Sequence, residues 1–340
     1  MIEHSNLPEI AIVTEGGSQI GMGHVYRSIT LAEELHADAI SVFLTKRNEA
    51  VATIARSGFD VVVCKTDEEI LGRLTQISPS VIVFDEPNLS ARLIENTRAS
   101  LGEETRIIVF DNYFAPDVNK RVDVVVNALV GEDFKNESVY DADADTQYYL
   151  GPKYLILRPE FFTRFEQRTR LDHPSEKRLL LFFGGADYSN LTTRMLDHVL
   201  RFDKEMRVHI IVGPAFGHFG ELNAVIQSDK GERGRIKVDR DVTNVQELMS
   251  NADAIITSPG LSMFEALRLG KRAIAIYQND YQRAVYKNFP IKCIIEQSDV
   301  SRIDSFVQGV DDYDEDDINK LEIGEGKTEL LLAIKNFIQI

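Results

Sequence analysis

The first glycine-rich loop of the chain combines backbone amides with a histidine. It reads Gly16-Gly17-Ser18-Gln19-Ile20-Gly21-Met22-Gly23-His24-Val25-Tyr26-Arg27, follows the apolar run 10–13 and precedes a segment of helical spacing, 28–35. A strand, a glycine turn and a helix N-terminus leave unpaired backbone N–H groups that attract anions. Histidine suits proton transfer near neutral pH, so His24 is the candidate catalytic residue.

The spacing of the glycines in this loop does not identify the class of ligand that the loop would bind. The glycines do not follow the G-x-G-x-x-G pattern of dinucleotide-binding turns, and the loop has no lysine followed by serine or threonine, as a P-loop requires. The structural alternative is that His24 only caps the helix while the glycines make a tight turn. The candidate substrate-binding residues here are Ser18, Gln19, Gly21, Gly23 and Arg27.

Small residues also follow a strand in the second half of the chain. The turn 258–262 comes directly after the apolar run 254–257, and such a turn lets a phosphate approach the amides of a helix N-terminus. Glu265 lies one turn into that helix, where its carboxylate can accept hydrogen bonds from ribose hydroxyls. An N-cap at Ser258 or Ser262, with Glu265 favouring the helix dipole, explains the same residues without a ligand.

Two further turns, 184–190 and 279–282, also join a strand to a helix. Because the carboxyl ends of parallel strands meet at one edge of a sheet, we predict a pocket for a nucleoside diphosphate there. Its candidate nucleotide-binding residues are Gly184, Ser258, Gly260, Ser262, Glu265 and Gln282, and Gly185 is a candidate contact of the sugar or diphosphate.

Carboxylates follow two strands of the first half, in Asp85-Glu86 and Asp111-Asn112. Asp85 and Asp111 are candidate substrate-binding residues, although carboxylates at strand ends also serve as helix caps and turn formers. The histidines show neither H-x-x-x-H spacing nor a cluster with cysteine, and no G-x-S-x-G elbow is present. We therefore predict neither a metal site nor a serine triad.

Short apolar runs alternate with amphipathic segments along the chain, which is typical of βαβ units around a parallel sheet. In the first half we expect strands at 9–14, 39–44, 60–64, 80–84, 106–110 and 122–126, and helices at 24–36, 47–57, 67–76 and 88–98. In the second half we expect strands at 178–183, 207–212, 234–238, 253–257, 272–276 and 292–295, and helices at 189–201, 243–250, 261–269 and 279–288.

The hydrophobic pattern breaks around 130–178, where the acidic stretch 140–145 carries no period. We expect the fold class α/β, with two doubly wound Rossmann-like domains facing each other across a cleft. The predicted boundaries are 1–150 for the N-terminal domain, 151–177 for an interdomain segment and 178–340 for the C-terminal, nucleotide-binding domain. The amphipathic last segment, 328–340, is expected to pack back on the body of the protein, with its helix on the N-terminal domain.

The charge of the amino-acid composition argues against some classes of binding partner. The 340 residues include 54 acidic and 38 basic side chains, for a net charge of −16, so neither nucleic acid nor an anionic membrane is expected as a partner. Cys64 and Cys293 lie in apolar runs and indicate buried thiols in a reducing compartment. The N-terminus lacks signal-peptide features and no apolar run can span a bilayer, so we expect a cytoplasmic protein without stable membrane insertion.

Four sets of residues together form a family pattern. They are Gly21, Gly23, His24, Val25 and Arg27 (G-x-G-H-V-x-R), the interdomain sequence 150–161, 183–187 with 190–192 (F-G-G-x-D…N-L-T), and Gly260 with Glu265. Through them the chain resembles UDP-2,4-diacetamido-2,4,6-trideoxy-β-L-altropyranose hydrolase of pseudaminic acid biosynthesis, together with related spore-coat polysaccharide biosynthesis proteins. The similarity covers residues 9 to 290, most of the chain.

This resemblance implies a fold of the glycosyltransferase-B type with UDP on the C-terminal domain, and no metal or cofactor. It implies hydrolysis of a UDP-activated amino deoxy sugar, with His24 as the base for water attack at the anomeric carbon. The chain departs from the family where a tyrosine is usual after the aspartate (Asp85-Glu86-Pro87), where a second aspartate is usual (Asp111-Asn112) and in the motif at 259–265. The natural sugar can therefore differ.

Two other functions fit the same residues. A glycosyltransferase of this fold would use an acceptor hydroxyl in place of water, and a nucleotide-sugar-binding subunit would have no catalysis at all. An apolar or basic patch near the first-half loops would favour a membrane acceptor, and the sequence has no strong cluster of that kind there, which favours hydrolysis. The presence of His24 argues against a purely binding role. The sugar, the pathway and the oligomeric state do not follow from the sequence.

Overall fold

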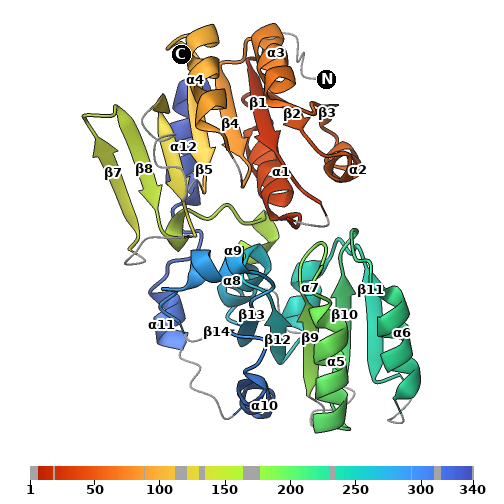
Figure 1. Ribbon diagram of the computed structural model, residues 1–340. Helices are drawn as coiled ribbons and strands as arrows, with labels where there is room; N and C mark the ends of the chain where they lie inside the picture. Colours follow the sequence, from red (N-terminus) through yellow and green to blue (C-terminus); the bar gives the residue numbers. More distant parts are fainter. Residues whose placement is uncertain are drawn as a thin grey trace. The chain divides into compact units, whose positions relative to one another are not determined.

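The computed structural model describes residues 7–17, 20–87, 89–111, 121–129, 135–163, 177–229, 234–291, 293–309 and 315–338. The chain forms two compact units, Met1–Ile156 with Leu321–Ile340 and Leu157–Lys320 (Figure 1). It therefore enters the second unit after Ile156 and returns to the first at Leu321. The terminal segment, which the predicted boundaries grouped with residues 178–320, belongs to the first unit.

A twisted parallel sheet forms the centre of the first unit. Its strands are β1 (Glu9–Thr14), β2 (Ile40–Thr45), β3 (Asp60–Val63), β4 (Val81–Asp85), β5 (Arg106–Phe110), β6 (Val124–Asn127), β7 (Glu137–Asp141) and β8 (Thr146–Leu150). Its helices are α1 (Gly23–Leu35), α2 (Asn48–Arg56), α3 (Asp67–Ile77), α4 (Ala91–Leu101), η3 (Pro152–Tyr154) and α12 (Lys327–Ile338). The strand order is β3-β2-β1-β4-β5-β6-β8-β7, and only the pair β7–β8 is antiparallel.

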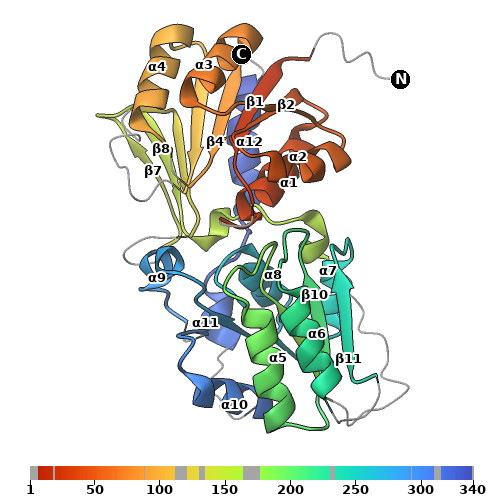
Figure 2. The ribbon, with the colours of Figure 1, turned by 45° about the vertical axis from the view of Figure 1, so that its right-hand side comes forward.

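Helices cover both faces of this sheet. Alternate strand residues point to opposite faces, so Val13 and Phe84 pack in one buried cluster with Leu74 of α3. On the other face, α12 contacts α1, and the two helices lie side by side in Figure 2. Lys327 Nζ of α12 donates to Glu34 Oε1 of α1 at 2.6 Å, which fixes the terminal helix to the first unit.

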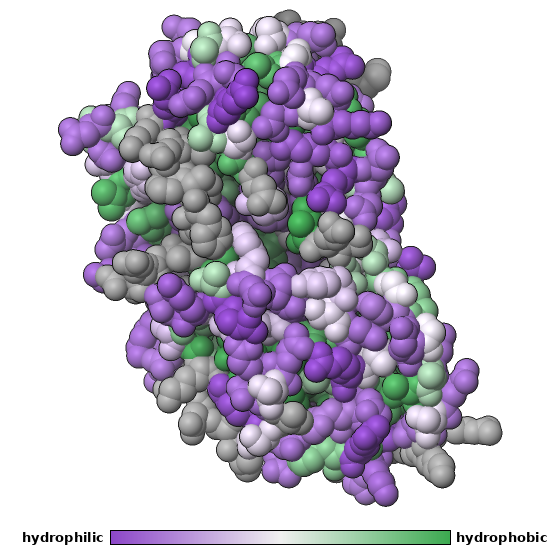
Figure 3. All heavy atoms as spheres, in the orientation of Figure 1, coloured by the Kyte–Doolittle hydropathy of each residue, from purple (hydrophilic) through white to green (hydrophobic). Residues whose placement is uncertain are grey.

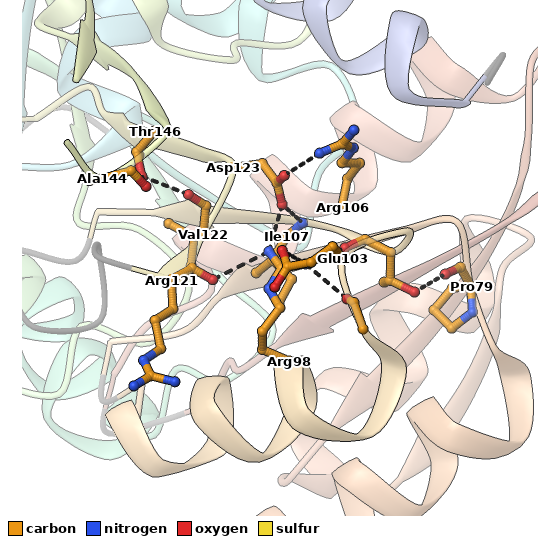
Figure 4. A network of polar contacts seen from close by, with 12 residues as sticks. Pro79, Arg98, Glu103, Arg106, Ile107, Arg121, Val122, Asp123, Ala144 and Thr146 are labelled. Carbon is orange, nitrogen blue, oxygen red and sulfur yellow. Dashed lines mark hydrogen bonds and ion pairs between the residues drawn. The ribbon is translucent and has the colours of Figure 1, made fainter. Parts of the chain in front are cut away.

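A polar network fixes the amino ends of the strands in the first unit (Figure 4). Arg98 of α4 donates to the Thr105 carbonyl at 2.7 Å and to Asp123 Oδ2 at 2.8 Å. Asp123 also accepts from Arg106 Nη1 at 2.8 Å and from the Ile107 amide at 2.7 Å. These contacts join α4 to the starts of β5 and β6, at the edge opposite to the carboxyl ends of the strands.

The second unit repeats the architecture of the first. Its strands are β9 (Arg178–Phe182), β10 (Arg207–Val212), β11 (Ile236–Arg240), β12 (Ala254–Thr257), β13 (Ala273–Ile276) and β14 (Ile294–Ile295). Its helices are η4 (Pro159–Phe162), α5 (Leu191–Phe202), α6 (Phe219–Ser228), α7 (Val245–Ser250), α8 (Leu261–Arg268), α9 (Asp280–Tyr286), α10 (Val300–Gln308) and α11 (Glu315–Asn319). The strand order is β11-β10-β9-β12-β13-β14, and every pair is parallel.

In both sheets the strand order reverses beside the first strand of the unit, so that successive strands are added first on one side of it and then on the other. In the first unit this switch point lies between β1 and β4, and in the second between β9 and β12. Ligands of doubly wound sheets bind outside the carboxyl ends of the strands at such points, because the loops there run to opposite faces. The α/β prediction with two Rossmann-like units is confirmed. Four of the segments singled out in the sequence follow the switch-point strands β1, β4, β9 and β12, and the other two follow β5 and β13.

The β7–β8 hairpin and the helices α6, α10 and α11 are absent from the sequence-based expectation. β7 is an edge strand exposed on both faces, with Val139 46% and Tyr140 57% exposed, so its sequence shows no alternation. In α6 only Leu222 is buried, which weakens the helical period.

Hydrophilic residues cover most of the face drawn in Figure 3. None of the helices in the described ranges combines the length and the apolar character needed to cross a bilayer.

Candidate functional site

His24 lies in the first turn of α1, directly after the loop that follows β1. The helix begins at Gly23 with Met22 as its N-cap residue, and no side chain caps it. The Nδ1 atom of His24 lies 2.7 Å from Oδ1 of Asp85, the last residue of β4, and the His24 side chain is 15% exposed. His24 therefore does not cap the helix but hydrogen-bonds the end of a neighbouring strand.

The spacing along α1 explains why three of its side chains converge on Asp85. Residues 24, 27 and 28 share one helix face, because positions three and four apart are neighbours. Arg27 Nε donates to Asp85 Oδ2 at 2.9 Å and Arg27 Nη2 to Oδ1 at 2.5 Å, while Ser28 Oγ donates to Oδ2 at 3.2 Å. Asp85 points to the α1 face because it lies one position beyond Phe84, which points to the other.

The charges around Asp85 keep it ionised. Asp85 and Arg27 are buried, and Arg27 Nη1 also pairs with Asp111 Oδ2. Burial alone would raise the pKa of Asp85, but Arg27 and His24 hold that pKa well below its usual range. Burial alone would lower the pKa of Arg27, but Asp111 and Asp85 outweigh it and the pKa is raised.

This arrangement selects one tautomer of His24. An ionised carboxylate only accepts hydrogen bonds, so the 2.7 Å contact with Asp85 Oδ1 places the proton of the His24 ring on Nδ1. Arg27 Nη2 lies 3.3 Å from Nδ1 but is itself a donor, so it forms no hydrogen bond with this tautomer. Nε2 then keeps its lone pair. A buried carboxylate therefore orients the His24 ring and leaves Nε2 as a hydrogen-bond acceptor.

Of the other residues predicted in this loop, the structure describes Gly21 and Gly23. Gly21 has φ +80° and forms two backbone hydrogen bonds with Gly17, of 2.8 and 2.9 Å, so the loop closes on itself through a left-handed position. Gly23 starts α1 with open space beside its Cα. Ser18, Gln19 and Asn112 lie outside the described residues.

A second polar cluster lies on the other side of β4. Glu86 follows Asp85 and so points to the α3 face, where Lys46 Nζ lies 3.1 Å from its Oε2. Lys46 also lies 2.9 Å from Asp67 Oδ1, at the start of α3, and 3.9 Å from Glu15 Oε1, after β1. Lys46 and Glu15 are not among the residues predicted from the sequence, although each directly follows a strand, β2 and β1. Within the described ranges no group of acidic, histidine or cysteine side chains is arranged to hold a metal.

Glu86 predicts an unusual pH dependence of stability. Burial raises its pKa from 4.5 to about 7, against the opposing effect of Lys46. The folded state therefore binds a proton more readily than the unfolded state, so stability falls as the pH rises from about 4.5 to about 7, by at most about 3 kcal/mol. Glu86→Gln has no such titration. Denaturant unfolding should show the variant gaining stability relative to wild type over this interval.

The matched control for this prediction is Glu95→Gln on α4, because the Glu95 side chain is 55% exposed. Its stability should follow the wild-type pH dependence within about 0.5 kcal/mol. An equal difference between Glu86→Gln and wild type at pH 4.5 and pH 7.5 would contradict the assigned titration.

In the second unit, Gln278 joins the three predicted turns. Its Nε2 donates to Ser258 Oγ at 2.7 Å and to the Phe183 carbonyl at 3.1 Å. The backbone carbonyl of Gln278 accepts from Ser189 Oγ at 2.8 Å, and its backbone N–H donates to Gln282 Oε1 at 2.8 Å. The ends of β9, β12 and β13 are therefore fixed to one another, as the sequence-based pocket requires. Gln278 was not singled out in the sequence, because only its tertiary contacts reveal this role.

The backbone explains Gly184 of the β9 turn and Gly213, which follows β10. Gly184 has φ +79°, and a Cβ on Gly213 would lie 2.3 Å from the carbonyl oxygen of Gly185. The helix start that follows the β9 turn is already occupied, because Asp187 accepts from the Leu191 and Thr192 amides at 2.8 Å each.

The start of α8 differs from the helix starts that follow the other two predicted turns, those of α5 and α9. The α9 start is capped by Asn279, whose Oδ1 accepts from the Gln282 amide at 2.7 Å. In α8 the residue before the helix is Gly260, with φ +153°, and no side chain caps the first turn. Ser262 lies in that turn. Free amides at a helix N-terminus favour an anion, so of the three starts α8 is the one suited to a phosphate.

Glu265 of α8 is paired inside the second unit. Its side chain is 7% exposed, and Arg158 donates to Oε1 through Nε at 3.1 Å and through Nη2 at 3.0 Å. Burial raises the pKa of Glu265 while Arg158 lowers it. The sequence did not indicate Arg158 as a partner, because the two residues are 107 positions apart.

Two proteins are similar in sequence to the chain. An uncharacterized protein of Methanocaldococcus jannaschii is 36% identical over 332 residues, which are 96% of this chain and 66% of that protein. The chain thus spans slightly less than two thirds of the length of this relative. The spore coat polysaccharide biosynthesis protein SpsG of Bacillus subtilis is 27% identical over 289 residues, 82% of this chain and 80% of SpsG. No protein-family model matches the chain.

Three solved structures share the fold at 13% identity or less. MurG of Acinetobacter baumannii has a TM-score of 0.60 and 13% identity, over 98% of this chain and 99% of MurG. The glycosyltransferase SnogD of Streptomyces nogalater has a TM-score of 0.56 and 12% identity, over 97% and 99%. HepE of Anabaena in complex with UDP-glucose has a TM-score of 0.53 and 9% identity, over 97% and 98%. The chain is therefore similar in sequence to SpsG and has the fold of the glycosyltransferase-B type.

Proposed function

We propose that this protein is a nucleotide-sugar hydrolase that releases UDP and a free amino or deoxy sugar in surface polysaccharide or nonulosonic acid biosynthesis. The observation that carries the proposal is the pair His24–Asp85, a base oriented by a buried carboxylate at the switch point of the first sheet. The similarity to SpsG, a spore coat polysaccharide biosynthesis protein, supports the pathway class. The resemblance to the hydrolase of pseudaminic acid biosynthesis supports the reaction.

In this reaction His24 Nε2 takes a proton from water as the water oxygen attacks the anomeric carbon. The bond between that carbon and the β-phosphate oxygen breaks, and its electron pair leaves with UDP. The proton then passes from His24 to solvent, and a single displacement inverts the anomeric centre. Asp85 stabilises the imidazolium formed at His24, since its carboxylate remains ionised. A base of this kind contributes about 10²–10⁴ to the rate.

The second unit would bind the UDP group. The free amides at the start of α8, with Ser262, would stabilise the diphosphate as negative charge develops on the leaving group. Glu265 would accept hydrogen bonds from the ribose hydroxyls. HepE has the same fold and was solved with UDP-glucose, which supports a UDP-sugar as the substrate class.

The experiment that tests the proposal follows nucleotide release from a panel of UDP-, CMP- and GDP-sugars, without acceptor or metal. Release of UDP from a diacetamido-trideoxyhexose donor, lost in His24→Ala, is the expected result. Tight UDP binding without release from any donor would contradict hydrolysis and favour a glycosyltransferase that uses an acceptor hydroxyl. The likeness to SnogD, a glycosyltransferase, makes that transferase the second candidate function.

Glu265→Gln provides a separate test of the nucleotide site. The amide keeps the shape of the side chain but loses the charge that accepts ribose hydrogen bonds. UDP should therefore bind more weakly by about 1–3 kcal/mol, which is about tenfold to hundredfold in Kd by calorimetry. Glu221→Gln on α6 is the control, because Glu221 belongs to the same unit, lies away from Arg158 in the chain and has a side chain that is 62% exposed. Unchanged UDP affinity in Glu265→Gln would remove Glu265 from the ribose site.

A further inference from the structure

We propose that Arg158 is a positioning residue of the nucleotide site, which holds Glu265 so that its second carboxylate oxygen accepts hydrogen bonds from ribose hydroxyls. The inference rests on the proposed function, because it takes a ribonucleotide as the ligand of the second unit. It adds a specificity: the protein should discriminate against 2′-deoxyribonucleotides, and the discrimination should depend on Arg158.

The hydrogen bonds leave one oxygen of Glu265 for a ligand. Arg158 Nε and Nη2 both donate to Oε1, at 3.1 and 3.0 Å. In the part of the chain that the structure describes, Oε2 has no hydrogen-bond partner, while the side chain is 7% exposed. A carboxylate oxygen has two acceptor positions, so Oε2 can accept from both hydroxyls of a ribose.

Arg158 is held from more than one side, so its direction does not depend on Glu265 alone. Its guanidinium lies 4.8 Å from the centre of the Phe161 ring, and Nη1 lies 3.4 Å from Glu160 Oε1. Arg268 of α8 lies 4.9 Å from the centre of the Phe162 ring, which fixes η4 on the same helix. The planar guanidinium therefore presents a fixed pair of donors to Glu265.

The positive charge of Arg158 also favours the ionised form of Glu265, which is the form that accepts hydrogen bonds from the ligand. Glu265 is buried, and a buried carboxyl without a cation takes up a proton more readily. A protonated carboxyl uses one oxygen as a donor and accepts more weakly with the other. Arg158 thus keeps Glu265 in the form that recognises a diol, and the loss of Arg158 should affect nucleotides that have the 2′-hydroxyl more than those that lack it.

The test compares the Kd values of UDP and 2′-deoxy-UDP in the full chain by calorimetry. Wild type should prefer UDP by about tenfold or more, as expected for a hydrogen bond to a charged acceptor. Arg158→Met should reduce this preference to within about twofold. Arg158→Lys should give an intermediate preference, because lysine keeps the charge but cannot donate the same forked pair.

Arg268→Met is the matched control, because it removes the other guanidinium that joins η4 to α8 and leaves the Glu265 pair intact. It should keep the wild-type preference. The preference is a ratio measured within one variant, so partial unfolding changes both Kd values equally. If Arg158→Met does not fold, the preference of Arg158→Lys decides the question.

The double variant Arg158→Met/Glu265→Gln distinguishes positioning from direct contact. If Arg158 acts through Glu265, the double variant should show the same preference and affinity as Glu265→Gln. A further loss would overturn the inference and indicate that Arg158 contacts the nucleotide itself. Undiminished preference in both Arg158 variants would overturn it while the proposed function stands. Wild-type protein that binds no UDP would instead refute the proposed function, and this inference with it.

Discussion

Replacing His24 by alanine should reduce nucleotide-sugar turnover by about 10²–10⁴ while UDP binds within a few-fold of wild type. The variant loses the one lone pair that the His24–Asp85 arrangement keeps for a substrate proton. UDP affinity should survive because the nucleotide contacts proposed here, at the start of α8 and at Glu265, belong to the second unit. Initial rates of UDP release and calorimetric UDP binding measure the two quantities.

His36→Ala is the matched control for this variant. His36 directly follows the last residue of α1 and is exposed, whereas His24 is at the start of the helix. Turnover in His36→Ala should equal that of wild type. Undiminished turnover in His24→Ala would refute the role as base, and so would a complete loss of UDP binding, which would place the histidine in the nucleotide site instead.

Replacing Arg27 by methionine should destabilise the protein by about 3–5 kcal/mol at neutral pH. Arg27 is 3% exposed and pairs with two buried carboxylates, Asp85 and Asp111. Methionine fills a similar volume but leaves both carboxylates in the interior without their cation, which costs more than the lost hydrogen bonds alone. Denaturant unfolding at pH 7.5 measures the difference, and Arg73→Met, at an exposed position of α3, should stay within about 0.5 kcal/mol of wild type.

The effect of Arg27→Met should shrink on acidification. In wild type the pKa of Asp85 lies below its ordinary value, so its contribution to stability is present above about pH 4 and is lost as the pH falls. In the variant the carboxylates lack a cation, so their protonation relieves the cost. The difference between wild type and variant should therefore be smaller at pH 4.5 than at pH 7.5. If the difference in stability between wild type and Arg27→Met were the same at both pH values, the variant would be destabilised by poorer packing and not by unpaired charge.

The sequence predicts the repeating strands and helices well where one face of an element is buried. The runs 10–13 and 81–84 are apolar because both faces of these strands are covered, and α1 has the period of a helix packed on a sheet. The same logic places His24 and Asp85 at the carboxyl ends of parallel strands. It fails for β7, because an edge strand exposed on both faces has no burial pattern to read.

Which partner each polar side chain takes is decided by the tertiary structure. His24 meets Asp85 because β1 and β4 are neighbours in the sheet, although the two residues are 61 positions apart. Asp85 and Glu86 are adjacent in sequence but join different clusters, because consecutive strand residues point to opposite faces. Local periodicity reports only whether a face is buried. Strand order determines what covers that face, and so decided the contacts of Gln278, Lys46 and Arg158.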